Sequence, residues 1–128
     1  MTNLENEWIT KALKDFGSAK LILNSQQEYY DQVCFLLQQS AEKLLKAYLI
    51  KNKAEISKTH DLVKLVSDCS KFNLKFLDWK NKALSLTTYA VDFRYPGEIA
   101  TKEEAFEAYK IAEEFSNFIL ECLEINKC

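Results

Sequence analysis

Apolar residues recur at every third or fourth position over most of this chain, the spacing that places side chains on one face of an α-helix. Short polar runs, of which residues 24–27 are the first, interrupt the pattern. The pattern predicts helices at about residues 4–24, 28–52, 60–70, 74–91 and 102–126. Four long helices and one short helix with short connections predict an all-α fold, an antiparallel up-and-down bundle that forms a single domain over residues 1–128.

The second predicted helix is the most apolar of the five. Its residues 33–37, Val-Cys-Phe-Leu-Leu, cover nearly the whole circumference of a helix. Such a helix belongs in the middle of a bundle or at a dimer interface. The fourth predicted helix carries a sparser apolar face, made of Leu77, Leu84, Thr88 and Val91.

Two of the predicted helices have recognisable starts. Thr59 is a plausible N-cap of the short third helix, and Asp61 favours the positive end of its dipole. The last helix opens with Thr101 followed three residues later by Glu104, the spacing of a capping box.

Composition narrows the function classes. A formal net charge of -2 argues against a strongly basic coat for nucleic acid, although lysines could still cluster locally. The N-terminus lacks the basic start and apolar run of a signal peptide, and no apolar stretch approaches membrane-spanning length. We therefore expect a cytoplasmic chain with no membrane partner.

The cysteines and the single histidine argue against a metal site. The four cysteines are scattered without a C-x-x-C pair, and His60 has no second histidine to complete a zinc site. Cys34, Cys69 and Cys122 lie among apolar neighbours and are expected in the core, whereas Cys128 is expected to be an exposed thiol. No metal or other cofactor is expected.

The second helix carries one polar band. Gln39, Glu42, Lys43, Lys46 and Lys53 lie at offsets that place them on a single helix face. The band is either a solvated face with weak Glu–Lys pairing or the cationic lining of a groove for a phosphate or an acidic partner.

Three further residues are candidates for binding chemistry. Histidine is the side-chain type whose charge ordinarily changes near neutral pH, so His60 could be a base or a nucleotide contact, or could be a structural residue at the start of the short helix. Arg94, the only arginine, precedes the only proline and could anchor a phosphate or hold a helix end. Tyr95 could stack on a base or pack under the turn.

Three runs of the sequence, in this order, resemble the HEPN family. They are residues 34–49 (CFLLQQSAEKLLKAYL), residues 58–62 (KTHDL) and residues 94–96 (RYP). The start at Trp8 and the helix from Thr101 to Ala112 fit as well, so the likeness covers about the whole chain.

The resemblance implies a bundle of four to five helices that usually dimerises. It also implies a prokaryotic protein that is often the partner of a minimal nucleotidyltransferase, in a two-component or toxin–antitoxin module. Many members of the wider family are metal-independent ribonucleases that carry an Arg, four to six residues and then a His at the opening of the last helix.

The ribonuclease motif is incomplete in this chain. Arg94 matches the Arg, but the His would fall at Ile99, Ala100 or Thr101, none of which can act as an acid or base. We therefore expect a non-catalytic HEPN protein that binds a nucleotide or nucleic-acid phosphate through Lys43, Lys46, His60, Arg94 and Tyr95. The alternatives are a ribonuclease toxin using Arg94 with a non-standard base, and a helical assembly platform with no ligand.

The apolar circumference of the second helix predicts a homodimer that buries part of this helix or of the last one. Light scattering at tens of micromolar, where an obligate interface of ordinary size should hold, is expected to give twice the chain mass. A monomer at that concentration would contradict the expectation.

Overall fold

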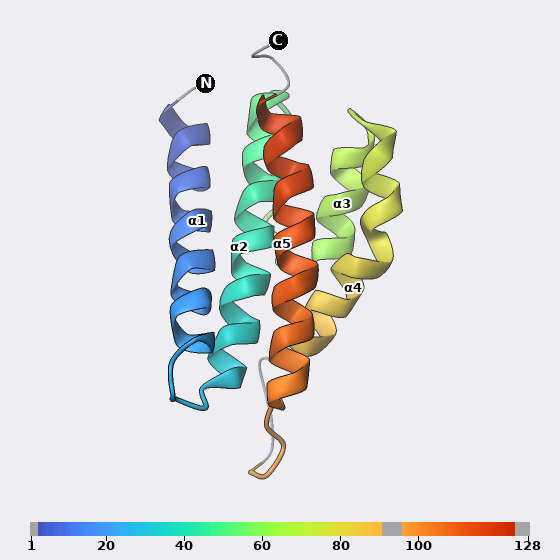
Figure 1. The fold of residues 1–128 in the computed structure, drawn as a ribbon. Coiled ribbons are helices and arrows are strands. Elements are labelled where there is room, and N and C mark those ends of the chain that lie inside the picture. Colours follow the sequence, from blue (N-terminus) through green and yellow to red (C-terminus); the bar gives the residue numbers. More distant parts are fainter. Residues whose placement is uncertain (1–2, 91–95, 125–128) are drawn as a thin grey trace.

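The chain folds into helices joined by short segments. The computed structural model describes residues 3–90 and 96–124. Its elements are α1 (Asn3–Leu23), α2 (Tyr30–Lys51), α3 (Leu62–Ser70), a 3-10 helix η1 (Leu74–Trp79), α4 (Lys80–Tyr89) and α5 (Lys102–Glu124) (Figure 1). The described residues contain no strand, so the predicted helical bundle is confirmed. None of the described helices is both long enough and apolar enough to cross a membrane.

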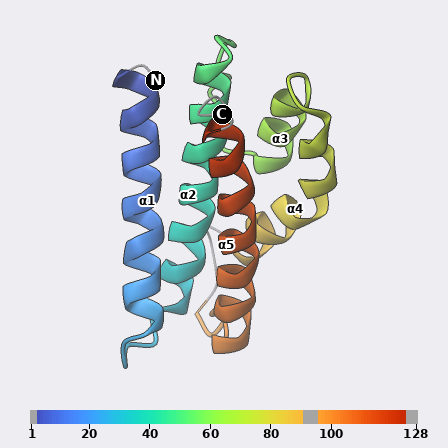
Figure 2. The same ribbon diagram turned by 45° about the horizontal axis from the view of Figure 1, so that its top comes forward.

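Among the described helices, the long ones alternate in direction as predicted, and the short helix α3 is the one element that departs from this alternation (Figure 1). α1 and α2 run antiparallel, but the segment between α2 and α3 returns along α2 before α3 begins (Figures 1 and 2). As a result His60 lies beside Gln38, and the Cys69 thiol donates to the Leu45 carbonyl at 3.7 Å. The contacting residue numbers increase together, from 38 with 60 to 45 with 69, so α3 runs in the same direction as α2.

α5 is also parallel to α2. At one end, the Ala100 backbone N–H donates to the Asp31 carboxylate at 2.7 Å. At the other end, the Lys51 ammonium donates to the carbonyls of Cys122 and Leu123, at 2.9 and 3.2 Å. Because the C-terminal end of a helix is the negative end of its dipole, Lys51 stabilises α5 there. An up-and-down order makes its second and fourth long helices parallel, so the directions of α2 and α5 agree with the predicted order (Figure 1).

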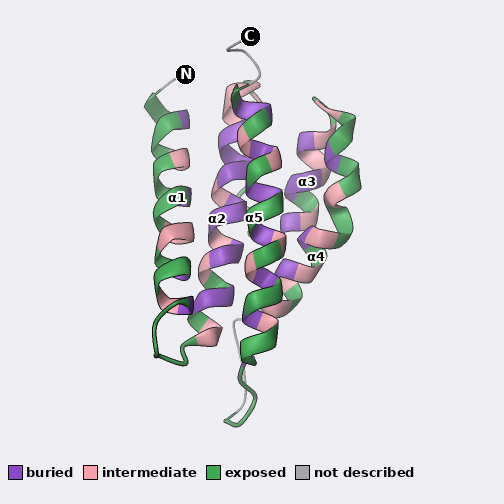
Figure 3. Ribbon diagram, in the orientation of Figure 1, coloured by how far each residue is buried: buried purple, intermediate pink, exposed green. Residues whose placement is uncertain are grey.

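α2 lies at the centre of the bundle. α1 packs on one side of it and α3 with α4 on another, while α5 covers a further face (Figures 1 and 2). Figure 3 shows buried positions over most of α2, and Val33, Leu37, Leu44 and Leu45 are fully buried. Four helices of the same chain thus cover α2, so the apolar circumference that suggested a dimer is satisfied within one subunit.

The fourth predicted helix is split into two kinds of helix. Residues 74–79 form a 3-10 helix before the α-helix starts at Lys80. A 3-10 helix has three residues per turn, so the phase of the buried face shifts relative to a continuous α-helix. Phe76, Ala83 and Leu86 are buried here, whereas Leu77 and Leu84 are exposed, contrary to the predicted apolar face.

The helix starts were partly predicted. The capping box of α5 is present, because the Thr101 hydroxyl accepts from the Glu104 N–H at 3.1 Å and the Glu104 carboxylate accepts from the Thr101 N–H at 2.9 Å. The cap of α3 is Asp61 rather than Thr59, since the Asp61 carboxylate accepts from the N–H groups of Val63 and Lys64. The Thr59 hydroxyl instead accepts from the Asp61 N–H at 3.1 Å and shapes the approach to the helix.

Candidate functional site

The polar band of α2 lies between α1 and the segment that leads into α3, and it is neither a solvated face nor an open cationic groove. Lys43 reaches across to α1 and pairs with Asp15, and both side chains are about one-fifth exposed. Lys46 turns back along α2 to Glu42, and both of these residues are buried. Lys53 lies beyond the end of α2, in a left-handed backbone conformation with φ of 57°. Each of Lys43 and Lys46 therefore has its own carboxylate.

Glu42 is the centre of the most buried polar group. Its side chain is only 4% exposed, and its Oε2 atom contacts two cationic or ionisable groups, the Lys46 ammonium at 2.9 Å and His60 Nδ1 at 3.0 Å. Its Oε1 atom also lies 3.2 Å from His60 Nδ1. Removing a carboxylate from water is costly unless it is paired and hydrogen-bonded, and both conditions are met here.

The Lys46 ammonium is covered from the α1 side. It lies 5.5 Å from the centre of the Trp8 ring, within the range of a cation–π interaction. Its side chain is 8% exposed. Trp8 therefore shields the Lys46–Glu42 pair from solvent, which strengthens the attraction between the two charges.

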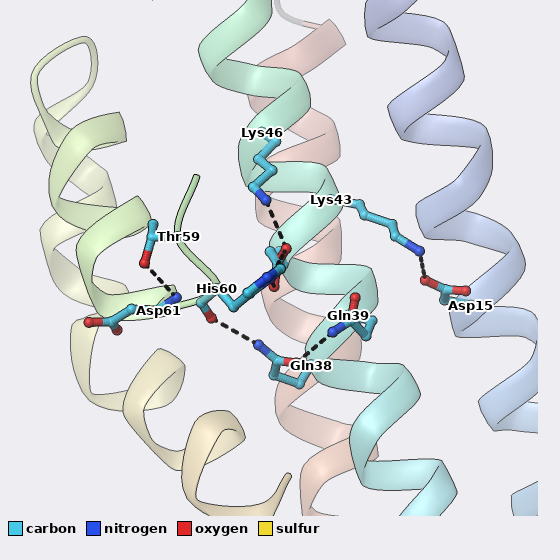
Figure 4. A network of polar contacts seen from close by, with 9 residues as sticks. Asp15, Gln38, Gln39, Lys43, Lys46, Thr59, His60 and Asp61 are labelled. Atoms are coloured by element: carbon cyan, nitrogen blue, oxygen red, sulfur yellow. Dashed lines mark hydrogen bonds and ion pairs between the residues drawn. The ribbon is translucent and has the colours of Figure 1, made fainter. Parts of the chain in front are cut away.

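His60 is held at two points while most of its ring remains in solvent. The side chain is 79% exposed, although Nδ1 faces Glu42. Its backbone carbonyl accepts from Gln38 Nε2 at 3.2 Å, so two residues one turn apart on α2 hold the same loop residue (Figure 4). A carboxylate paired with Lys46 accepts hydrogen bonds, so the Nδ1 atom of neutral His60 carries the proton and Nε2 keeps its lone pair.

A cavity of about 320 Å³ adjoins His60. It is lined by residues of α2, of α4 and of the loop before α3, namely Phe35, Gln38, Gln39, His60, Thr87 and Ala90. A larger cavity of about 530 Å³ lies between residues 54–57 and α3. In the larger cavity the Asp68 carboxylate pairs with the Lys64 ammonium at 2.6 Å and lies 3.9 Å from the Lys71 ammonium. These three charged groups therefore form ion pairs with one another. The smaller cavity is the better candidate, because it borders a fixed imidazole.

Cys69 and Cys122 are not activated thiols, and the described residues contain no metal-binding cluster. Burial raises the pKa of the Cys69 thiol and, to a lesser extent, that of Cys122, so neither is an activated thiolate. Cys34, Cys69 and Cys122 are buried in the core as expected, and Cys128 lies outside the described residues. Within residues 3–90 and 96–124, no three His, Cys, Asp or Glu side chains are grouped so that they could hold a metal ion.

Comparison with known protein families decides the relationship. The model of the HEPN domain matches residues 5–123, nearly the whole chain. This chain belongs to the HEPN family. No curated protein sequence matches it.

Two solved structures are similar over almost their full length. The protein TT1696 from Thermus thermophilus is 25% identical, with a TM-score of 0.77, and the match covers 94% of this chain and 98% of that one. ST0689, described as an archaeal HEPN homologue, is also 25% identical, with a TM-score of 0.70 and coverage of 93% and 96%. The helical arrangement described above is thus shared with solved HEPN structures.

The structure brings together only part of the set of site residues expected from the sequence. Lys46 and His60 meet at Glu42, whereas Lys43 turns away to α1. Arg94 and Tyr95 lie outside the described residues. Sequence reasoning placed Glu42 in the band but missed its organising role. The spacing of Gln38, Glu42 and Lys46 at four-residue intervals was the available signal, but nothing local indicated that His60 returns to that face.

We expect Glu42→Leu to destabilise this HEPN domain by about 3 kcal/mol, because it leaves the Lys46 ammonium buried without a carboxylate. The double change Glu42→Leu with Lys46→Met should recover most of that loss, since it removes both charges and keeps apolar volume. Urea unfolding followed by circular dichroism measures both free energies.

His60→Ala is the matched control, and its cost should stay below about 1 kcal/mol because the imidazole is largely exposed. A double variant as unstable as Glu42→Leu alone would show that the charge pair is not the source of the loss.

Proposed function

We propose that this HEPN protein binds the phosphate of a nucleotide or nucleic acid without cleaving it. The observation that carries the proposal is His60, whose ring is held by buried Glu42 and borders a cavity at the surface. In its protonated form, an imidazole fixed in this way presents an Nε2–H donor to an anion and loses little side-chain freedom on binding.

The charges around the cavity favour His60 as the anion contact. Glu42 and Lys46 cancel one another, so protonation of His60 adds the unbalanced positive charge at this point. Lys43 is already paired with Asp15 and would have to exchange that carboxylate for a phosphate. Arg94 and Tyr95 remain candidates on the strength of the family resemblance, and the bidentate guanidinium of Arg94 is suited to a phosphate.

We also propose that the protein acts as a homodimer beside a minimal nucleotidyltransferase, in a two-component, toxin–antitoxin-like module. This part rests on the likeness to small prokaryotic HEPN proteins. A nucleotidyltransferase gene next to the gene for this chain, and co-purification of the two products, would support it.

A ribonuclease is the second candidate, because one observation favours it. A histidine oriented by a buried carboxylate is the arrangement that general bases use, and activation of a 2'-hydroxyl requires such a base. Against it stands the incomplete family motif, which has no histidine after Arg94. An assembly platform becomes the better account if the protein binds no anion.

Binding is expected to depend on His60 and to weaken with salt. Titration of the wild type with AMP or a short RNA at low ionic strength should show binding that His60→Ala weakens by about tenfold, the loss of roughly one charge-assisted hydrogen bond. Lys43→Ala is the matched control and should change the affinity little. If Lys43→Ala weakens binding as much as His60→Ala, the anion lies across the band of α2 and not at His60.

Purified protein is expected not to cleave RNA, with or without divalent metal ions. The measurement is gel analysis of a labelled RNA incubated with wild type, Arg94→Ala and His60→Ala, which should give identical patterns. Cleavage that disappears in both variants would establish the ribonuclease and would identify His60 as its base.

A further inference from the structure

The cavity beside His60 has features that select one kind of base, an inference that rests on the nucleotide binding proposed above. Its volume of about 320 Å³ is near the lower end of the roughly 300–1,000 Å³ typical of small-molecule sites. A cavity of this size suits a single nucleotide better than a folded or double-stranded nucleic acid.

Phe35 supplies an open aromatic surface in this cavity. It belongs to the apolar run at residues 33–37, in which Val33, Cys34 and Leu37 are buried, yet Phe35 is 42% exposed. An exposed phenyl ring at a cavity wall can stack on a base. Every nucleobase has a face that can stack, so this contact contributes affinity without selectivity.

Gln39 supplies a directional polar edge. Gln38 Nε2 donates to the His60 carbonyl at 3.2 Å, which turns Gln38 Oε1 toward Gln39. Gln39 Nε2 donates to that oxygen at 3.4 Å (Figure 4). This relay orients both amides. The carbonyl oxygen and the second amide hydrogen of Gln39 have no partner among the described residues, so one acceptor and one donor stand side by side.

The two residues lie on the same side of α2. Phe35 and Gln39 are four positions apart, which places them one above the other on the helix face. A base stacked on Phe35 would then lie within reach of an in-plane contact from the Gln39 amide. A side-chain amide makes two hydrogen bonds with adenine: its oxygen accepts from the N6 amino group, and its N–H donates to N7. Guanine presents two acceptors, O6 and N7, on the corresponding edge, and one of them would face the Gln39 oxygen.

We propose that this cavity selects adenine nucleotides, with Phe35 stacking on the base, Gln39 reading its N6–N7 edge and His60 lying at the phosphate side. Titration calorimetry of the wild type should give AMP an affinity at least about tenfold higher than GMP, the discrimination expected of one bidentate amide pair. AMP with carbon in place of N7 should lose most of that advantage. This comparison needs no variant, so it does not depend on the folding of a mutant.

Variants separate the contributions further. Gln39→Leu should abolish the preference for AMP over GMP, and Phe35→Leu should weaken both nucleotides alike. Gln27→Leu and Phe72→Leu, changes at exposed positions outside this cavity, are the matched controls and should leave both affinities unchanged.

Ribose 5-phosphate distinguishes the two proposals. If AMP, GMP and ribose 5-phosphate bind equally and all depend on His60, adenine selection is overturned while phosphate binding stands. If none of the three binds at low salt, both proposals fail.

Discussion

The arrangement of this HEPN domain depends on one buried carboxylate. Glu42 lies within the central helix, and its Oε2 atom contacts both the Lys46 ammonium and His60 Nδ1. A lone carboxylate at 4% exposure would be strongly disfavoured, so buried Lys46 must stay paired with it once the helix is packed, and His60 adds a second, more exposed contact. Lys46 comes from the same helix, one turn on, whereas His60 must be brought back by the loop that follows α2.

That requirement links the local pairing to the path of the chain. The loop after Lys51 returns along α2 far enough to bring His60 level with Gln38 and Glu42. α3 then starts at Leu62, with Asp61 as its cap, and runs parallel to α2. The contacts of His60 with Gln38 and Glu42 therefore lie directly before the start of the third helix and at the border of the cavity between α2 and α4.

The sequence predicted the helices well because the apolar period is a local property. The helical class, the ends of α1 and α2 within a few residues, the start of α5 and the capping box at Thr101 could all be derived in this way. The direction of the short helix α3 could not, since it depends on the return of a ten-residue loop whose contacts lie on a distant turn of α2.

The candidate site was harder to predict for the same reason. The band on α2 was identified, and the Glu42 partner of Lys46 lies within it, but Asp15, which pairs with Lys43, and Trp8, whose ring covers Lys46, are both distant in sequence. A pattern that records only one helix cannot show whether its lysines face solvent, a ligand or a carboxylate of another helix. His60 was singled out as the only histidine, and its structural and binding roles are compatible, because Glu42 holds one nitrogen and leaves the other toward solvent.

The tautomer of His60 tests this account most directly. The chain contains a single histidine, so its ring signals in a long-range ¹H–¹⁵N correlation spectrum need no assignment. In the neutral form the account predicts a proton on Nδ1 and a free lone pair on Nε2, and a shift toward the Nε2-protonated form in the double variant Glu42→Leu, Lys46→Met. A wild-type ring protonated on Nε2, or a spectrum that the double variant leaves unchanged, would contradict the claim that Glu42 orients His60.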